Sequence, residues 1–104
     1  MHLNLSENFL NGTLDSSAGK LMSIQDLNLD NNQITSLPPS VGGWLEIQIF
    51  SIANNAILEL PNECSEWTLL KNLNIRGNRI SSLDPFLSLW SQVIESLAVS
   101  TKFI

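Results

Sequence analysis

Four asparagines recur at a nearly constant interval along the chain. Asn8, Asn32, Asn55 and Asn78 lie 24, 23 and 23 residues apart. Apolar residues recur at fixed distances from each asparagine, and each complete unit fits L-x-x-L-x-L-x-x-N-x-L-x-x-L, with Ile or Phe at some Leu positions. A period of roughly 20–50 residues is typical of solenoids and other repeat arrays, in which each repeat is one structural unit. The sequence therefore predicts a stack of similar coils.

A second set of columns has the same period. Three tryptophans are 23 residues apart, and the single cysteine of the chain lies in another column. Because independent columns agree over almost the whole chain, a chance match is implausible. We expect the tryptophans to stack inward and Cys64 to be a small buried thiol. The two columns consist of Leu21, Trp44, Trp67 and Trp90, and of Val41, Cys64 and Leu87.

These units resemble the leucine-rich repeat family over residues 2–104. The unit endings Leu37-Pro38 and Leu60-Pro61 are similar to intracellular repeats of Ras-associated scaffold proteins, whereas residues 8–14 resemble the N-x-L-x-G-x-I segment of plant-type repeats. The resemblance implies an α/β fold: a right-handed solenoid with a parallel concave sheet and short helical or irregular convex segments. It also implies a single domain over residues 1–104, with about four to five coils and partial coils at both ends.

Each unit has a short alternating segment that predicts one strand of the concave sheet. Side chains alternate across a strand, so Leu27 and Leu29 point inward while the residues between and beside them point outward. After the turn, Ile34 and Leu37 return to the interior. The outward columns are mostly small and polar. They hold Asp26, Ile49, Asn72 and Ser96; Asn4, Asn28, Ser51, Asn74 and Ala98; Ser6, Asp30, Ala53, Arg76 and Ser100; and Glu7, Asn31, Asn54, Gly77 and Thr101.

The recurrent asparagines have a physical reason to occupy the turn after each strand. Backbone N–H and C=O groups lose their strand partners there, and the next coil buries them, so they need hydrogen bonds. An asparagine side chain carries both donors and an acceptor. The alternative is that these are ordinary turn asparagines, although a turn residue need not keep one column. We predict a structural ladder of Asn8, Asn32, Asn55 and Asn78.

The convex segments vary in composition. Residues 15–22 predict about two helical turns, and residues 41–44, with two glycines, predict an irregular or 3₁₀ return. Residues 61–70 predict the start of a short helix, with Asn62 as its N-cap and acidic residues in the first turn. A further helix is predicted over residues 86–96.

Composition excludes several classes of function. The net charge is −5, and the few basic residues are scattered, which argues against binding to nucleic acid. No apolar run approaches the roughly 18–20 residues that span a bilayer, and no signal peptide is recognisable, so we expect no membrane insertion. A lone cysteine favours a reducing, cytoplasmic compartment. The acceptor triplets for N-glycosylation at Asn4 and Asn11 favour instead an extracellular receptor.

No pattern of residues points to catalysis. His2 is the only histidine, it lies at a terminus expected to fray, and no nucleophile or phosphate-loop motif accompanies it. One Cys and one His, 62 positions apart, make no metal site. Asp26 and Asp30 are expected to be solvated acidic residues on one face. We therefore predict a non-enzymatic protein without a metal or cofactor.

The resemblance implies a protein-interaction module, a scaffold or adaptor, that binds an unidentified protein partner on its concave face. The alternative is a ligand-recognition fragment of an extracellular leucine-rich repeat receptor. Solenoids need polar caps, and the terminal units here are partial, which predicts either a fragment of a longer protein or self-association through uncapped ends. The candidate binding residues are Asp26, Asn28, Asp30, Ser51, Asn74 and Arg76.

Overall fold

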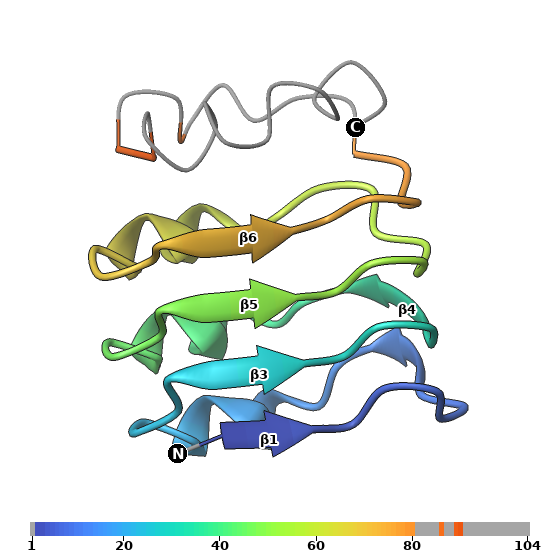
Figure 1. The fold of residues 1–104 in the computed structure, drawn as a ribbon, viewed down its shortest axis with the longest axis horizontal. Helices are drawn as coiled ribbons and strands as arrows, with labels where there is room; N and C mark the ends of the chain where they lie inside the picture. Colours follow the sequence, from blue (N-terminus) through green and yellow to red (C-terminus); the bar gives the residue numbers. More distant parts are fainter. Residues whose placement is uncertain (1, 81–85, 87–88, 91–104) are drawn as a thin grey trace.

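Four short parallel strands stack into one sheet, as Figure 1 shows for this computed structural model, which describes residues 2–80, 86 and 89–90. The strands are β1 (His2–Asn4), β3 (Asp26–Asn28), β5 (Ile49–Ser51) and β6 (Asn72–Asn74), and they pair in that order. Each strand begins one turn of the chain. We call residues 2–25 the first coil, 26–48 the second, 49–71 the third and 72–80 the described part of the fourth.

The strand register confirms the predicted columns. Leu3 pairs with Leu27, Leu27 with Phe50, and Phe50 with Leu73, while Asn28 pairs with Ser51 on the outward side. A shift of one residue would turn the apolar set outward, so burial of one face fixes this register. The sequence period therefore predicted both the strand pairing and which side of each strand faces the interior.

A second sheet, which the sequence did not predict, lies after the turn. It pairs β2 (Asn11–Thr13) with β4 (Gln33–Ser36) in parallel, with an irregularity between Gly12 and Thr13. It lies in the middle of the first two coils, and Figure 1 shows β4 beyond the carboxyl end of β3. In β4 the buried Ile34 has exposed residues on both sides, which is the alternation expected of a strand. The pattern covers only four residues.

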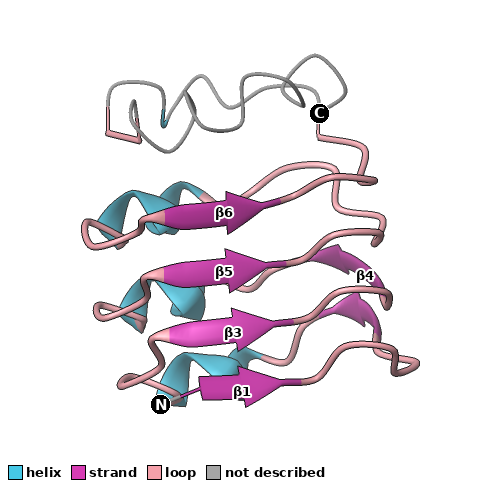
Figure 2. Cartoon of the chain, in the orientation of Figure 1, coloured by secondary structure: helices cyan, strands magenta, loops and turns pink. Residues whose placement is uncertain are grey.

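The return segments are 3₁₀-helices, drawn in cyan in Figure 2. They are η1 (Ser16–Lys20), η2 (Pro39–Gly43) and η3 (Asn62–Glu66). The predicted 3₁₀ return at residues 41–44 is confirmed. The prediction of Asn62 as N-cap is wrong, because Pro61 occupies that position, without a side-chain hydrogen bond, and Asn62 is the first helical residue.

The other helix predictions differ in outcome. Residues 15–22 contain only the five-residue η1, in which Asp15 caps the first turn by accepting a hydrogen bond from the Ser17 backbone N–H at 2.9 Å. The return segments of the first two coils pack closely, because a methyl group added at Gly19 of η1 would collide with Ser40 of η2. Small residues in these segments therefore allow the close packing. The helix predicted over residues 86–96 lies largely outside the described residues.

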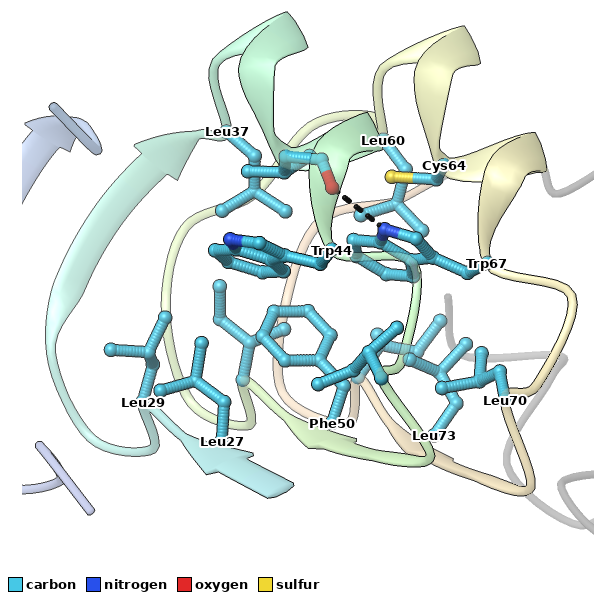
Figure 3. Close-up of a cluster of buried hydrophobic side chains, with 14 of the residues drawn as sticks. Leu27, Leu29, Leu37, Trp44, Phe50, Leu60, Cys64, Trp67, Leu70 and Leu73 are labelled. Atoms are coloured by element: carbon cyan, nitrogen blue, oxygen red, sulfur yellow. Dashed lines mark hydrogen bonds between the residues drawn. The ribbon is translucent and has the colours of Figure 1, made fainter. Parts of the chain in front are cut away.

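The core fills the space between the four-stranded sheet and the 3₁₀-helices, as Figure 3 shows. Trp44 and Trp67 stack with ring centroids 5.7 Å apart, and Trp67 and Trp90 stack at 6.1 Å. Trp67 donates through Nε1 to the Val41 carbonyl at 2.9 Å, and Trp44 donates likewise to Ala18. The predicted inward tryptophan column is thus confirmed, with an indole hydrogen bond that ties each of these two returns to the preceding one.

Candidate functional site: the outward face of the four-stranded sheet

The outward face of the four-stranded sheet is the only extended surface on which the sequence placed candidate binding residues. We call it the sheet face. It corresponds to the predicted concave side, and its members alternate with the buried leucines and phenylalanine of the strands. Its described members are His2, Asn4, Ser6 and Glu7; Asp26, Asn28, Asp30 and Asn31; Ile49, Ser51, Ala53 and Asn54; and Asn72, Asn74, Arg76 and Gly77.

The asparagine that follows each strand holds its coil against the previous one. The Asn55 Nδ2 donates to the carbonyls of Leu29, Ile52 and Ala53 at 3.0–3.1 Å, and its Oδ1 accepts from the Ile34 N–H at 3.0 Å. Asn32 and Asn78 repeat this arrangement with the equivalent groups. The Asn8 side chain differs, because its Nδ2 donates only to carbonyls of its own coil. Buried backbone groups of the turn are thereby satisfied.

The residue before each of these asparagines has a left-handed backbone conformation. Glu7, Asn31 and Asn54 have φ of 57°, 59° and 58°, and Gly77 has φ of 72°. Only Gly and, to a lesser degree, Asn adopt this conformation readily. This preference explains the Asn-Asn pairs in the turns of the second and third coils. Asn54 also donates through Nδ2 to the Asn31 Oδ1 at 3.1 Å, so these asparagines form a second, outer row of contacts.

Several predicted binding residues use part of their side chain internally. The Oδ1 atoms of Asn28 and Asn74 accept from the backbone N–H two residues on, at 2.9 and 3.2 Å, as does the Oδ1 of Asn4. These bonds are Asx-turns, which shape the exit from the strand. Among the described residues, the Asx-turns use only the Oδ1 atoms of these side chains and not their amide nitrogens.

Asp30 replaces the missing Asx-turn in the third coil. Its Oδ1 accepts from the Ser51 hydroxyl at 2.6 Å and from the Ala53 backbone N–H at 2.8 Å. Ser51 stands where the other coils have asparagine, and its hydroxyl donates to Asp30 of the neighbouring coil. The carboxylate of Asp30 is therefore fixed in place as well as charged.

Three of the predicted residues line one depression on the sheet face. Its volume is about 360 Å³, and Asp30, Asn74 and Arg76 line it together with Ala53, Asn54 and Gly77. Arg76 is exposed, and in the part of the chain that the structure describes no ion pair joins it to Asp30. The depression thus presents a carboxylate and a guanidinium that do not neutralise each other.

A second depression lies at the first two coils and contains two more of the predicted residues, Asp26 and Asn28, whereas Ser51 lines neither depression. It has a volume of about 270 Å³ and is lined by His2, Leu3, Asn4, Asp26 and Asn28. His2, expected to fray, instead lies in β1, with its Nδ1 3.3 Å from the Asp26 Oδ2. The sequence reasoning missed this pair because it did not extend the outward column of Asp26 back by one coil.

Two side chains of reactive types, Cys64 and Asp15, lie in structural positions. Cys64 is buried, and burial raises the pKa of its thiol well above the usual range, which keeps it protonated. The hydrogen bonds from Ser17 lower the pKa of Asp15, which lies at the start of η1 and away from the sheet face. Among residues 2–80, 86 and 89–90, no three His, Cys, Asp or Glu side chains gather as a metal-binding group. No helix in those residues is long and apolar enough to cross a membrane.

Comparisons with known proteins agree with this geometry. The family model described as Leucine Rich Repeat matches residues 23–44 and 69–90. A solved structure of a leucine-rich repeat protein from Leptospira interrogans aligns with a TM-score of 0.77 at 27% sequence identity, and the alignment covers 85% of this chain and 23% of that chain. None of the curated protein sequences matches significantly. The matched repeats, the period of the asparagines and the stacked coils together show that this chain contains repeats similar to the leucine-rich repeat family and has the fold of a leucine-rich repeat solenoid.

Proposed function

We propose that this chain is a non-enzymatic protein-interaction module, a scaffold or adaptor, that binds a protein partner on the sheet face. Protein binding is the general role of leucine-rich repeats, which supports the class of function. The observation that carries the choice of surface is the depression at Asp30, Asn74 and Arg76, where three of the six predicted binding residues meet. The remaining three, Asp26, Asn28 and Ser51, extend the same surface along the strands.

The character of the surface supports recognition through hydrogen bonds and charge. Asn28 and Asn74 each keep an amide nitrogen that is not used by the Asx-turn, and Asp30 is held by two hydrogen bonds before any partner arrives. A side chain that is already ordered loses less conformational entropy on binding. The rows of hydrogen bonds between coils hold these groups at fixed spacings, so the sheet face is a preorganised platform.

A pair of charge-swapped variants tests this proposal. Asp30→Lys with Arg76→Glu changes the sheet face and keeps the net charge, while Lys20→Glu with Glu66→Lys makes the same exchange on the exposed returns. We expect the first variant to lose its partners in a quantitative pull-down from cells and the second to retain them, provided that circular dichroism shows both to be folded. Retention by the first variant with loss by the second would contradict the proposal.

The alternative function is ligand recognition within an extracellular receptor. Two observations favour it: the acceptor asparagines Asn4 and Asn11 are both exposed, and the plant-like first unit forms the second sheet through β2. Intact mass measurement of the protein isolated from its natural source separates the two functions. A glycan on Asn11 of the natural protein would favour the receptor, whereas unmodified Asn11 on secreted natural protein would count against it.

A further inference from the structure

The charges of the sheet face are separated by sign along the stack of coils. The first two coils carry the carboxylates of Glu7, Asp26 and Asp30, whereas the described part of the fourth coil carries Arg76. The four sheet-face positions of the third coil, between them, hold no charge. Since the strands run perpendicular to the stack, an elongated partner that crosses the strands would meet an acidic end, a neutral middle and a basic end.

The depression at Asp30 and Arg76 sets the scale of this pattern. Asp30 and Arg76 occupy the same outward column, two coils apart, with the small and buried Ala53 between them. Neighbouring strands are about 4.8 Å apart, so two steps separate these positions by about 10 Å. The methyl group of Ala53 leaves room above it, and the two charges flank that room from opposite sides.

The neutral middle also offers an apolar contact. Ile49 points outward from β5 and is 39% exposed, the largest exposed fraction of an apolar side chain on the sheet strands. It lies one strand step from Asp26 on one side and from Asn72 on the other. Ile49 precedes Ala53 by four residues, or about 13 Å of strand, so it offers apolar surface to the side of the Asp30–Arg76 column and not between the two charges.

From these observations we propose that the sheet face binds a protein segment with a basic side chain and an acidic side chain about 10 Å apart on one side. The basic group lies against Asp30, the acidic group against Arg76, and the part of the segment between them passes over Ala53. This inference rests on the proposed function and specifies its partner. A nucleic acid fits poorly because phosphates would meet the acidic coils, and a free amino acid is too short to reach both charges.

The order of the charges is the part of the inference that discriminates between partners. An exposed ion pair changes affinity by at most about fivefold, so each contact alone is weak. A segment with the opposite order would place like charges together at both ends, and such contacts disfavour wrong partners. The two pairs therefore select the direction in which the segment lies across the coils.

A peptide display selection on the folded chain tests this inference. A library of random 12-residue peptides is selected on the wild-type protein, and affinities of the enriched peptides are then measured by fluorescence polarisation. Asp30→Asn removes a charge while keeping an acceptor for Ser51 and Ala53, and Arg76→Gln removes the opposite charge. Lys20→Gln and Glu66→Gln on η1 and η3 are matched controls.

The expected result is enrichment of peptides with one basic and one acidic position in a fixed order. Each sheet-face variant should weaken their binding about two- to fivefold, and the controls should leave it unchanged. A peptide in which Lys replaces the acidic residue should bind the Arg76→Glu variant well and the wild-type protein poorly. This rescue is the sharpest arm, because a purely structural effect of residue 76 would not depend on the charge of the peptide.

The contrary results separate this inference from the function on which it rests. Peptides blocked by Asn72→Trp on the sheet face but insensitive to the charges of Asp30 and Arg76 would overturn the inference and leave the proposed function standing. Peptides insensitive to both kinds of change would contradict both. A selection that enriches no peptide would also count against the inference, since the library contains the required spacing many times.

Discussion

The first and third coils have equivalent residues at corresponding repeat positions, but these residues differ in burial and in hydrogen bonding to the neighbouring coils. Leu3 and Leu5 of the first coil are half-buried, whereas the equivalent Phe50 and Ile52 are 1% and 0% exposed. The Asn8 side chain bonds only within its own coil, whereas the Asn55 side chain also binds groups of the preceding coil. In a solenoid each repeat contacts only its neighbours, so stability is a sum of repeat and interface terms. The same residue type therefore contributes more with a coil on both sides.

The largest expected difference concerns the apolar interior. Ile52→Ala should lower the free energy of unfolding by about 3–4 kcal/mol, because the side chain is fully buried and a cavity remains. Leu5→Ala, at the equivalent position of the first coil, should cost only about 1–2 kcal/mol. Urea unfolding followed by tryptophan fluorescence measures both values. Equal losses would show that the first coil is as well covered as the third.

The asparagine columns give a similar comparison for hydrogen bonds. Asn55→Ala removes one acceptor and a donor group that bind two coils, so we expect a loss of about 3 kcal/mol. Asn8→Ala removes bonds to the Leu5 and Ser6 carbonyls at an exposed site, and we expect a loss below about 1 kcal/mol. The urea midpoints of the two variants should differ at a constant slope. A larger loss for Asn8→Ala would break the comparison.

Substitutions at two glycines with left-handed backbone conformations distinguish backbone strain from steric clash of an added methyl group. Gly12 in the first coil has no atom within 4 Å of an added methyl group, so Gly12→Ala should cost about 1 kcal/mol from backbone strain alone. At Gly77 an added methyl group would also collide with the Asn54 Oδ1, so Gly77→Ala should cost about 2–3 kcal/mol. Thermal unfolding of both variants checks the order. Equal effects would mean that Asn54 moves aside freely.

The smallest effect is a predicted gain in stability. Glu7 is the only non-glycine, non-asparagine residue with positive φ among the described residues. Glu7→Gly should raise the free energy of unfolding by about 0.5–1 kcal/mol, the relieved strain less the extra entropy of an unfolded glycine. Asn31→Gly is the control and should not stabilise the chain, because Asn31 accepts a hydrogen bond from Asn54. A loss of stability in Glu7→Gly would show that its side chain has an unrecognised contact.

The sequence was sufficient to predict the coils because inward residues repeat at every turn. The positions of Leu27, Phe50 and Leu73, the tryptophan column and the buried Cys64 followed from that period and are confirmed. The second sheet was missed because β2 and β4 are so short that only one residue of β4, Ile34, is buried.

The internal use of the predicted binding residues could not be read from a periodic pattern. A period indicates whether a side chain points in or out, but not which neighbouring group it reaches along the surface. The bonds from Ser51 and the Ala53 backbone to Asp30 exist because the third coil lacks the asparagine that the second and fourth coils have. Similarly, the pair of His2 and Asp26 depends on the exact strand start. Such contacts require coordinates.

The measurement that tests the role of the sheet face most directly is a chemical-shift map of a bound partner. Backbone amide spectra of the isotope-labelled chain are recorded while a selected peptide or recovered protein segment is added. We predict that the largest shifts fall at residues 26–31, 49–54 and 72–77, with small changes at η1, η2 and η3. Shifts concentrated in the 3₁₀-helices, with the sheet strands unchanged, would contradict binding at the sheet face.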